Sequence, residues 1–438
     1  MTGGHTGNVQ HPNTLDHLTS EHSVIVCCGS GGVGKTTTSA AIALAGAMSG
    51  RRTCVVTVDP ARRLATALGI EQLTNTPVPI SPEALELPQG GELWAMMLDP
   101  KATFDGLIDR YAPSRQQAER IMENRIYKEL TSALSGTQEY MAMEKLYELV
   151  EEGGYDLVVV DTPPTRNAID FLEAPSRLVH FLEHRLFRML LAPTRVYLKA
   201  VSIATQAFLR TISKVAGAEI VDDAVAFFQA FEGMEEGFRT RAEKMSALVK
   251  ETSTGFVLVT SPRQDAVTEA DWFAKRLHQM GIEVKALVVN RTHPMFVQGE
   301  ELLQSLVTTH LADAPTLPDG GAGTGSAEDY LKSLLSLIPP PVHTENTAIV
   351  TDPDTIFELL LANLLRYQLI ALTEQHTYSD LAAHLATAHR QDPDIAAGST
   401  APAQRPFAVI NVPLMTEDVH DLEGLKAMAG ALATSARA

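Results

Sequence analysis

Short apolar runs alternate with longer stretches of helical spacing through most of the chain. The first run covers residues 23–28, and a glycine-rich turn, a helical stretch at 35–49 and a second apolar run at 53–58 follow it. Mainly apolar runs that do not alternate with charged residues are typical of strands that a parallel sheet buries on both faces. The opening of the chain therefore predicts a strand, a helix and a second, parallel strand.

Further apolar runs, most of them rich in β-branched residues, extend this pattern to the far end of the chain, at residues 93–98, 157–160, 256–260, 284–289 and 407–412. Strands that alternate with helices predict an α/β fold with a doubly wound, mostly parallel sheet. Because the last run lies near the C-terminus, it must complete a sheet that begins near the N-terminus. We therefore expect residues 21–433 to form a single domain.

Two stretches between the strands, 102–152 and 176–251, are too long for simple crossovers and carry helical apolar spacing with few glycines or prolines. They predict a helical subdomain inserted into the domain. The second stretch is rich in Leu, Phe and Met. Core packing explains most of these side chains, and an apolar groove is the alternative.

Other segments read as loops or as poorly ordered ends. Residues 312–327 are rich in Gly, Pro and Asp, and residues 390–406 are rich in Pro, Ala and Ser, so we expect two mobile loops. The polar segment 1–20 and the tail after residue 433 are expected to be disordered.

Composition narrows the classes of function. With 45% hydrophobic residues, a chain of 438 residues can bury a large core. The net charge of −18 disfavours nucleic acid as a partner, since affinity for phosphodiester backbones rests on clustered Lys and Arg. No apolar run reaches the roughly 20 residues of a membrane span, and the polar start lacks the apolar core of a signal peptide. We therefore expect a cytoplasmic protein without an integral membrane segment.

The chain has three cysteines, Cys27, Cys28 and Cys54, and each falls in an apolar run read as a strand. Reduced, buried thiols are the expected state of cysteines in such runs. Adjacent residues of a strand face opposite ways, so these thiols do not form a trap for a trivalent metalloid.

The glycine-rich turn matches the pattern G-x-x-x-x-G-K-[ST] from Gly29 to Thr36, between a strand and a helix. Its backbone N–H groups and the helix N-terminus are suited to phosphates. Lys35 is predicted to neutralise the β- and γ-phosphates, and Thr36 to offer its hydroxyl to Mg²⁺. The predicted ligands are therefore ATP and Mg²⁺, held by Gly31, Gly32, Val33, Gly34, Lys35, Thr36 and Thr37.

Two aspartates follow strands that neighbour this loop. Asp161 comes directly after the run 157–160 and is predicted to hold Mg²⁺ through water. Asp59 ends the run 53–58; it is predicted to orient and polarise the attacking water, and is included among the metal ligands. Either aspartate alone would be read as a turn or helix cap. Their joint placement with the P-loop favours a catalytic site.

Four segments in this order resemble the successive motifs of the anion-transporting ATPase family, which includes the arsenical-pump ATPase and the targeting factor for tail-anchored membrane proteins. They are residues 29–37, 59–64, 161–165, and 412–414 with 422–425. The resemblance runs from about residue 24 to 431. It implies a dimeric, nucleotide-driven ATPase, with Asp59 in switch I, Asp161 opening switch II, Asn290 reading adenine and Pro413 in the adenine loop. An amide that donates and accepts suits an adenine edge, although a strand-ending turn also explains Asn290.

The chain departs from the family at Ser30, where the family carries a lysine that reaches the partner's phosphates. A neutral hydroxyl cannot supply that charge. The chain is therefore expected either to hydrolyse ATP slowly by itself or to form a heterodimer with a paralogous ATPase that bears the lysine; Arg62 or Arg63 is a less favoured local substitute. No Cys-x-x-Cys follows Asn290, so a zinc-clamped dimer is not expected.

Three functions compete at this point. The leading hypothesis is a dimeric ATPase switch, homodimeric or heterodimeric, that handles a hydrophobic protein client. The alternative is a non-catalytic nucleotide-binding subunit that stabilises an active partner, which Ser30 favours and Asp59 opposes. A DNA-partitioning ATPase is opposed by the acidic charge and by the length of the helical insertions.

Overall fold

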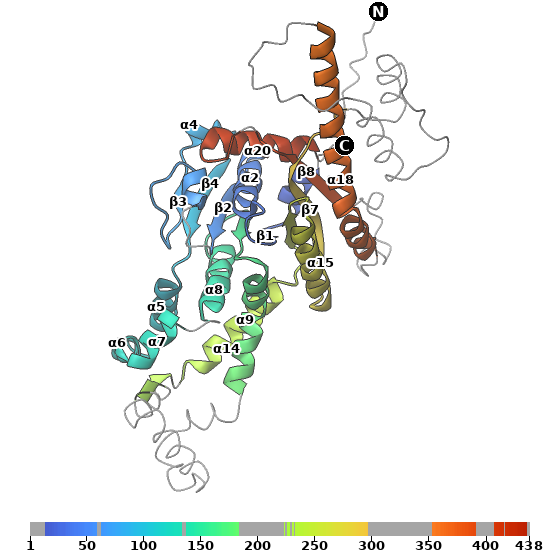
Figure 1. Ribbon diagram of the computed structural model, residues 1–438. Coiled ribbons are helices and arrows are strands. Elements are labelled where there is room, and N and C mark those ends of the chain that lie inside the picture. Colours follow the sequence, from blue (N-terminus) through green and yellow to red (C-terminus); the bar gives the residue numbers. More distant parts are fainter. Residues whose placement is uncertain are drawn as a thin grey trace, which may run out of the picture.

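The fold is built on one eight-stranded sheet, shown in the computed structural model of Figure 1. The structure describes residues 14–58, 63–133, 137–183, 223, 226–227, 230–231, 233–296, 353–390, 407–415 and 417–435. The strand order is β3-β4-β2-β5-β1-β6-β7-β8, and every neighbouring pair is parallel except β3 with β4. The strands are β1 Val24–Cys28, β2 Arg52–Thr57, β3 Val78–Pro79, β4 Glu92–Met97, β5 Leu157–Asp161, β6 Thr254–Thr260, β7 Val284–Thr292 and β8 Ala408–Pro413.

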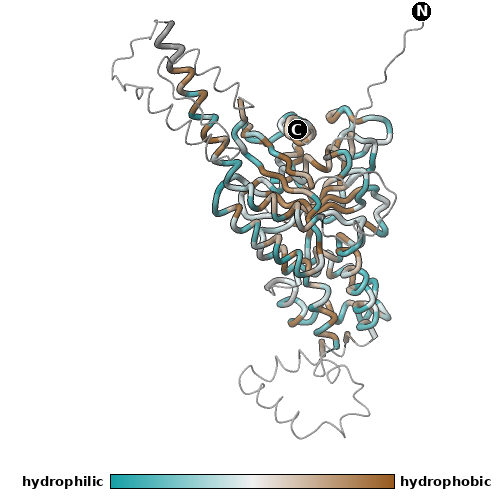
Figure 2. Tube along the Cα trace, turned by 90° about the vertical axis from the view of Figure 1, so that its right-hand side faces the viewer, coloured by the Kyte–Doolittle hydropathy of each residue, from teal (hydrophilic) through white to brown (hydrophobic). Residues whose placement is uncertain are grey.

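Helices cover both faces of this sheet, as α/β chains require. One apolar cluster contains Leu15, Leu44 and Leu425 and packs α1, α2 and α20 on one face. The second lies on the other face, under α8, α9 and α15, and Figure 2 shows the apolar strands between the two layers. The helices are α1 Thr14–Glu21, α2 Lys35–Met48, α3 Arg63–Ala67, α4 Pro82–Leu85, α5 Pro100–Tyr111, α6 Arg115–Glu123, α7 Arg125–Ala133, α8 Thr137–Glu151, α9 Thr165–Glu183, α14 Glu235–Leu248, α15 Gln264–Gln279, α18 Pro353–Arg390 and α20 Leu422–Ser435.

The predicted fold class, a doubly wound and mostly parallel sheet, is confirmed. β8 from the far C-terminal part pairs with β7 in parallel, with Ala286 opposite Ala408. Most strand bounds differ from the apolar runs by one or two residues. The larger differences are at β7, which extends three residues beyond its apolar run to Thr292 through an irregularity in its pairing with β8.

The prediction of disorder over residues 1–20 is wrong for residues 14–20, which belong to α1. Leu15 is 1% exposed and Leu18 is 6% exposed, and both pack into the cluster with α2. This short helix buries two leucines on one side. Its other residues are polar, so the apolar spacing of the two leucines did not indicate a helix. Residues 1–13 lie outside the described part. Likewise, α20 continues to Ser435, beyond the predicted end of the fold at 433.

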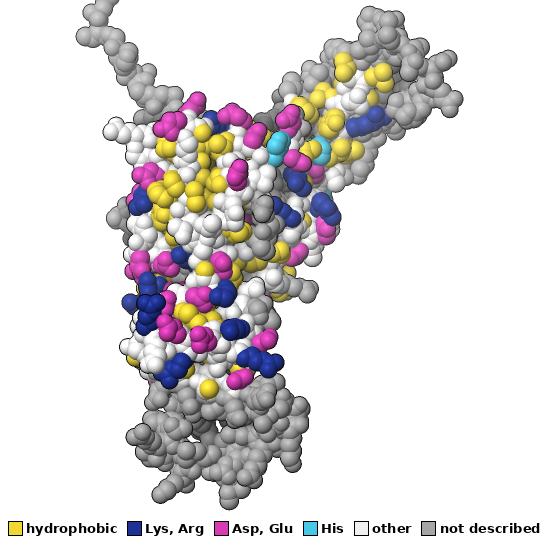
Figure 3. All heavy atoms as spheres, turned by 90° about the vertical axis from the view of Figure 1, so that its left-hand side faces the viewer, with side chains coloured by type: hydrophobic (Ala, Val, Ile, Leu, Met, Phe, Trp, Pro, Cys, Tyr) yellow, Lys and Arg dark blue, Asp and Glu magenta, His cyan; other side chains and the backbone are white. Residues whose placement is uncertain are grey.

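Helices α5 to α8, with α9 and α14, lie beneath the sheet in Figure 1. Much of the range 176–251 lies outside the described residues, so the division into a domain and a helical subdomain remains a prediction. Side chains of opposite charge are interspersed over these helices on the face drawn in Figure 3. Ion pairs of these helices include Arg110 with Glu152 and Arg177 with Glu173.

The long helix α18 was not predicted, and it projects beyond the sheet in Figures 1 and 2. Its second half packs on α15 and β7. The predicted loop 312–327 lies wholly outside the described residues; of 390–406, only Arg390, the last residue of α18, is described. Within the described ranges, no helix combines the length and apolar character that a membrane span requires.

Candidate nucleotide-binding site

The carboxyl ends of three neighbouring strands meet where the glycine-rich turn begins. β5 lies between β1 and β2, and Asp161 at its end is in register with Cys27 on one side and Thr57 on the other. The amide of Val58 also donates to the Asp161 carbonyl over 3.2 Å. Ligands of open α/β sheets bind at this edge. The turn after β1 and the aspartate at the end of β5 are therefore brought together.

The turn between β1 and α2 depends on its glycines. A Cβ on Gly29 would lie 2.0 Å from the carbonyl oxygen of Val259 in β6, too close for any side chain. Gly32 and Gly34 have φ angles of 79° and 94°, in the left-handed region that glycine tolerates. Gly34 caps α2 without a side chain. The backbone can therefore curl tightly into the start of the helix, the geometry that suits bound phosphates.

Lys35 lies over this turn. Its side chain is 8% exposed, and its Nζ donates to the Ser30 carbonyl over 2.8 Å. Thr36 and Thr37, in the first turn of α2, are partly exposed. The ammonium group and the N-terminal end of α2 are therefore next to each other, and both favour an anion. Ser30, at the position of the family's lysine, is 5% exposed.

Asp161 is 1% exposed, and its Oδ2 accepts a hydrogen bond from the Thr57 hydroxyl at 2.8 Å. That bond fixes the carboxylate at the sheet edge. The next residue, Thr162, turns its hydroxyl toward the sheet and donates to the Cys27 carbonyl over 2.7 Å. Thr162 therefore stabilises the sheet edge.

Oxygen ligands suit Mg²⁺, which keeps several waters and takes few protein groups beside phosphates. The Thr36 hydroxyl in the first turn of α2 and the Asp161 carboxylate at the end of β5 are oxygen donors of this kind. No cluster of three or more His, Cys, Asp and Glu occurs in the part of the chain that the structure describes. The residues present fit a magnesium ion that is completed by phosphate and water.

Asp59, the predicted water-activating residue and third metal ligand, lies outside the described residues, as does Arg62. The flanking residues are described: β2 ends at Thr57, beside Asp161, and α3 begins at Arg63. The roles given to Asp59 therefore stay predictions.

Asn290 lies inside β7 and contacts the P-loop directly. It is 7% exposed, and its Nδ2 donates to the Val33 carbonyl over 2.9 Å. A Cβ on Gly34 would come within 2.2 Å of that nitrogen. Asn290 therefore belongs to β7 and holds the P-loop through this hydrogen bond. It does not lie in a turn at the end of the strand. Its reading of adenine stays a prediction.

A pocket of about 490 Å³ opens beside Asn290, and Gly34 and Thr37, at the helix end of the phosphate turn, line part of it. Pro413, the last residue of β8, and the residues that follow it form a second wall. Sequence reasoning missed Arg291, because nothing in the pattern marks the residue after Asn290. The lining residues are Gly34, Thr37, Arg63, Thr66, Asn290, Arg291, Pro413, Leu414, Met415, Glu417, Asp418, Val419 and Met428.

The three thiols are buried in β1 and β2, as expected. Burial raises the pKa of Cys28 and that of Cys54 to about 12, and it raises the pKa of Cys27 further. Thiolates are the form that binds soft metals. Cys28 and Cys54 pack in one apolar cluster of the sheet and Cys27 packs in the other.

Comparison with known proteins agrees with these features. A family model described as "Anion-transporting ATPase" matches residues 22–306. The chain is 29% identical to "ATPase GET3" of Malassezia globosa over 282 residues, 64% of this chain and 76% of that protein. It is 24% identical to "ATPase ASNA1 homolog" of Entamoeba dispar (65% and 81%) and 26% identical to "ATPase ARSA2" of Chlamydomonas reinhardtii (73% and 86%).

Proposed function

Because the chain belongs to the anion-transporting ATPase family, we propose that it binds ATP with Mg²⁺ and hydrolyses it to ADP and phosphate. The observation that carries this proposal is the convergence of Lys35 and the buried Asp161 carboxylate on one sheet edge. A pocket large enough for a nucleoside adjoins that edge at Asn290.

Each residue has a defined part in the proposed reaction. The N–H groups of the turn and Lys35 bind the phosphates, and Lys35 exchanges its bond to the Ser30 carbonyl for phosphate oxygens. Thr36 and Asp161 hold Mg²⁺, with Asp59 as a further ligand; when bound, the ion neutralises charge on the phosphates. Asp59 orients the attacking water and accepts its proton. Asn290 and Pro413 bind the adenine.

Fast hydrolysis is proposed to need a partner. With Ser30 in place of the family's lysine, this chain contributes no cation from the second position of its P-loop to a second active site. A cytoplasmic heterodimer with a paralogous ATPase that keeps the lysine would restore one such cation. A homodimer would lack this cation at both active sites, and its turnover would be slow.

The client is proposed to be a hydrophobic protein segment. Phe181 at the end of α9 is 51% exposed, and it lines a hollow of about 760 Å³ with Leu172, Val249, Met280 and Ile282. Glu173, Arg177 and Lys250 also line the hollow. An exposed aromatic side chain beside an apolar hollow with a polar rim is typical of interaction sites. The nucleotide cycle would alter this surface through α9, which begins four residues after Asp161.

The alternative is a nucleotide-binding subunit without turnover of its own. Ser30 favours it, since the charge that completes the active site is missing. The alternative predicts ATP binding with no hydrolysis in any combination of subunits.

Asp59→Asn separates the two functions. We expect the purified wild-type chain to release phosphate from ATP, faster with a lysine-bearing paralogue, and Asp59→Asn to keep ATP binding while losing turnover. Asp109→Asn, an exposed change on α5, should leave the turnover as it is. Equal turnover in Asp59→Asn would contradict the role of Asp59. ATP binding without phosphate release in every combination would favour the non-catalytic subunit.

The client is tested with a leucine-rich helical peptide of about 20 residues. The ATP-trapped Asp59→Asn protein should bind this peptide more tightly than the nucleotide-free protein does, by fluorescence anisotropy. Affinity that is independent of nucleotide would contradict a switch.

A further inference from the structure

Arg291 has an unfavourable backbone conformation at the mouth of the nucleotide pocket. Its φ angle is 64°, in the left-handed region where a residue with a Cβ is strained. Strain of this kind is concentrated at binding sites, where surrounding structure holds it in place. No role has been assigned to Arg291 in the proposed reaction.

The strain arises where the pairing of β7 with β8 is irregular. Asn290 is opposite Val412, and Thr292 is opposite Pro413, so Arg291 is left out of the register. In a regular strand Asn290 and Arg291 would face opposite sides. A bulge can turn a side chain toward a new direction.

At this bulge, both side chains reach the same loop. Nδ2 of Asn290 is 2.9 Å from the Val33 carbonyl oxygen. Nη1 of Arg291 is 3.5 Å from the carbonyl oxygen of Gly32, which directly precedes Val33 in the P-loop. The arginine is exposed and lines the same pocket as Asn290 and Pro413. Its side chain therefore spans from β7 to the P-loop across one side of the space for the nucleoside.

We propose that Arg291 covers one face of the purine base of the bound nucleotide, with its guanidinium held against the P-loop by the Gly32 carbonyl. This inference rests on the nucleotide-binding function proposed above. A guanidinium is planar and stacks on aromatic rings. Every base has such a face, so stacking adds affinity without selecting adenine over guanine. Arg291 would thus supply affinity, and Asn290 the choice of base.

The test compares two ligands that differ only in the base. ATP and ribose 5-triphosphate are titrated calorimetrically, at one Mg²⁺ concentration, into the wild type and Arg291→Ala. We expect Arg291→Ala to bind ATP on the order of tenfold more weakly and to bind ribose 5-triphosphate as the wild type does. Arg115→Ala is the matched control, because that arginine is 92% exposed on α6. It should change neither affinity.

Arg291→Gly distinguishes lost stacking from a damaged fold. Glycine relieves the left-handed backbone, so this variant should unfold at a temperature no lower than that of the wild type, yet bind ATP as weakly as Arg291→Ala. Equal losses for ATP and ribose 5-triphosphate would assign Arg291 to the phosphates and overturn the inference, as would unchanged ATP binding. If the wild type bound neither ligand, the proposed function itself would fail.

Discussion

At the scale of single residues, the phosphate turn depends on how closely its backbone approaches the next strand. Gly29 passes so near β6 that a Cβ would overlap the Val259 carbonyl, whereas a Cβ on Gly31 would meet nothing within 4 Å. Both positions belong to the same motif, but each needs glycine for a different reason. The first is required by packing, and the second leaves room for a ligand.

Gly29→Ala should therefore destabilise the protein, and Gly31→Ala should not. Overlap with a backbone oxygen can be relieved only by moving β1 away from β6, so we expect a loss on the order of 2 kcal/mol or more in the free energy of unfolding. Urea denaturation of both variants measures this. Equal stability of the two alanine variants would contradict the close approach at Gly29.

Sequence reasoning identified Lys35 and Asp161 because their position after strands is visible in the pattern of apolar residues. It missed Arg291, because a bulge in β7 depends on the pairing partner β8, about 120 residues away, and no local pattern records that pairing. It also could not show that the Thr162 hydroxyl is taken up by the Cys27 carbonyl. Contacts between distant strands determine both features.

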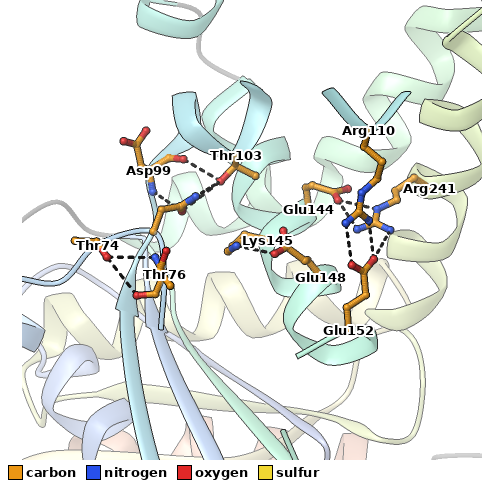
Figure 4. Close-up of polar contacts among 11 residues, drawn as sticks. Thr74, Thr76, Asp99, Thr103, Arg110, Glu144, Lys145, Glu148, Glu152 and Arg241 are labelled. Carbon is orange, nitrogen blue, oxygen red and sulfur yellow. Dashed lines mark hydrogen bonds and ion pairs between the residues drawn. The ribbon is translucent and has the colours of Figure 1, made fainter. Parts of the chain in front are cut away.

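At the scale of elements, a buried ion pair joins the helices beneath the sheet (Figure 4). Arg241 of α14 lies 2.6 Å from Glu144 of α8, and these residues are 8% and 1% exposed. Arg241 also reaches Glu152, which Arg110 of α5 holds with two hydrogen bonds of 2.6 and 2.8 Å. The cluster fixes three helices to one another.

Removing one partner of this pair should cost more than removing both. Arg241→Met leaves the Glu144 carboxylate buried without its cation, so the free energy of unfolding should fall by about 3 to 5 kcal/mol. Adding Glu144→Leu should restore much of that loss. Urea denaturation of both variants measures the coupling. Arg239→Met, at a partly exposed arginine of the same helix, is the control and should change the urea midpoint far less. Additive losses would contradict the coupling.

Glu152 makes part of the stability dependent on pH. Hydrogen bonds from Arg110, aided by Arg241, lower the pKa of Glu152 from 4.5 to about 2. The unfolded chain binds the proton first, so this stabilisation is complete above about pH 4.5 and is lost as the pH falls toward 2. The difference in urea midpoint between wild type and Glu152→Gln should shrink over that range. A difference that is constant with pH would contradict the pKa.

Element type was predictable where burial on both faces left a continuous apolar run, as in β1, β2 and β5. A helix was missed where its apolar residues are few and lie among polar ones. α1 buries only two leucines in eight residues, and the polar remainder resembled a disordered end. Tertiary packing against α2, which sequence spacing does not express, stabilises it.

At the scale of the whole molecule, the site is assembled from both ends of the chain. The turn after β1 and the aspartate at the end of β5 supply the phosphate side, and β7 with β8 supplies much of the pocket. Since β8 follows β7 by more than 100 residues, the nucleoside pocket exists only in the complete sheet. ATP binding should therefore report on the integrity of the whole domain.

The decisive measurement is calorimetric titration of the folded protein with ATP in the presence and absence of Mg²⁺, for the wild type, Lys35→Ala and Asp161→Asn. We predict that the wild type binds ATP, that Lys35→Ala weakens binding by about 100-fold, and that Asp161→Asn removes the gain that Mg²⁺ gives. Lys101→Ala, an exposed lysine of α5, is the control and should bind as the wild type does. Absence of ATP binding by the folded wild type, or equal binding by Lys35→Ala, would contradict a nucleotide site at this sheet edge.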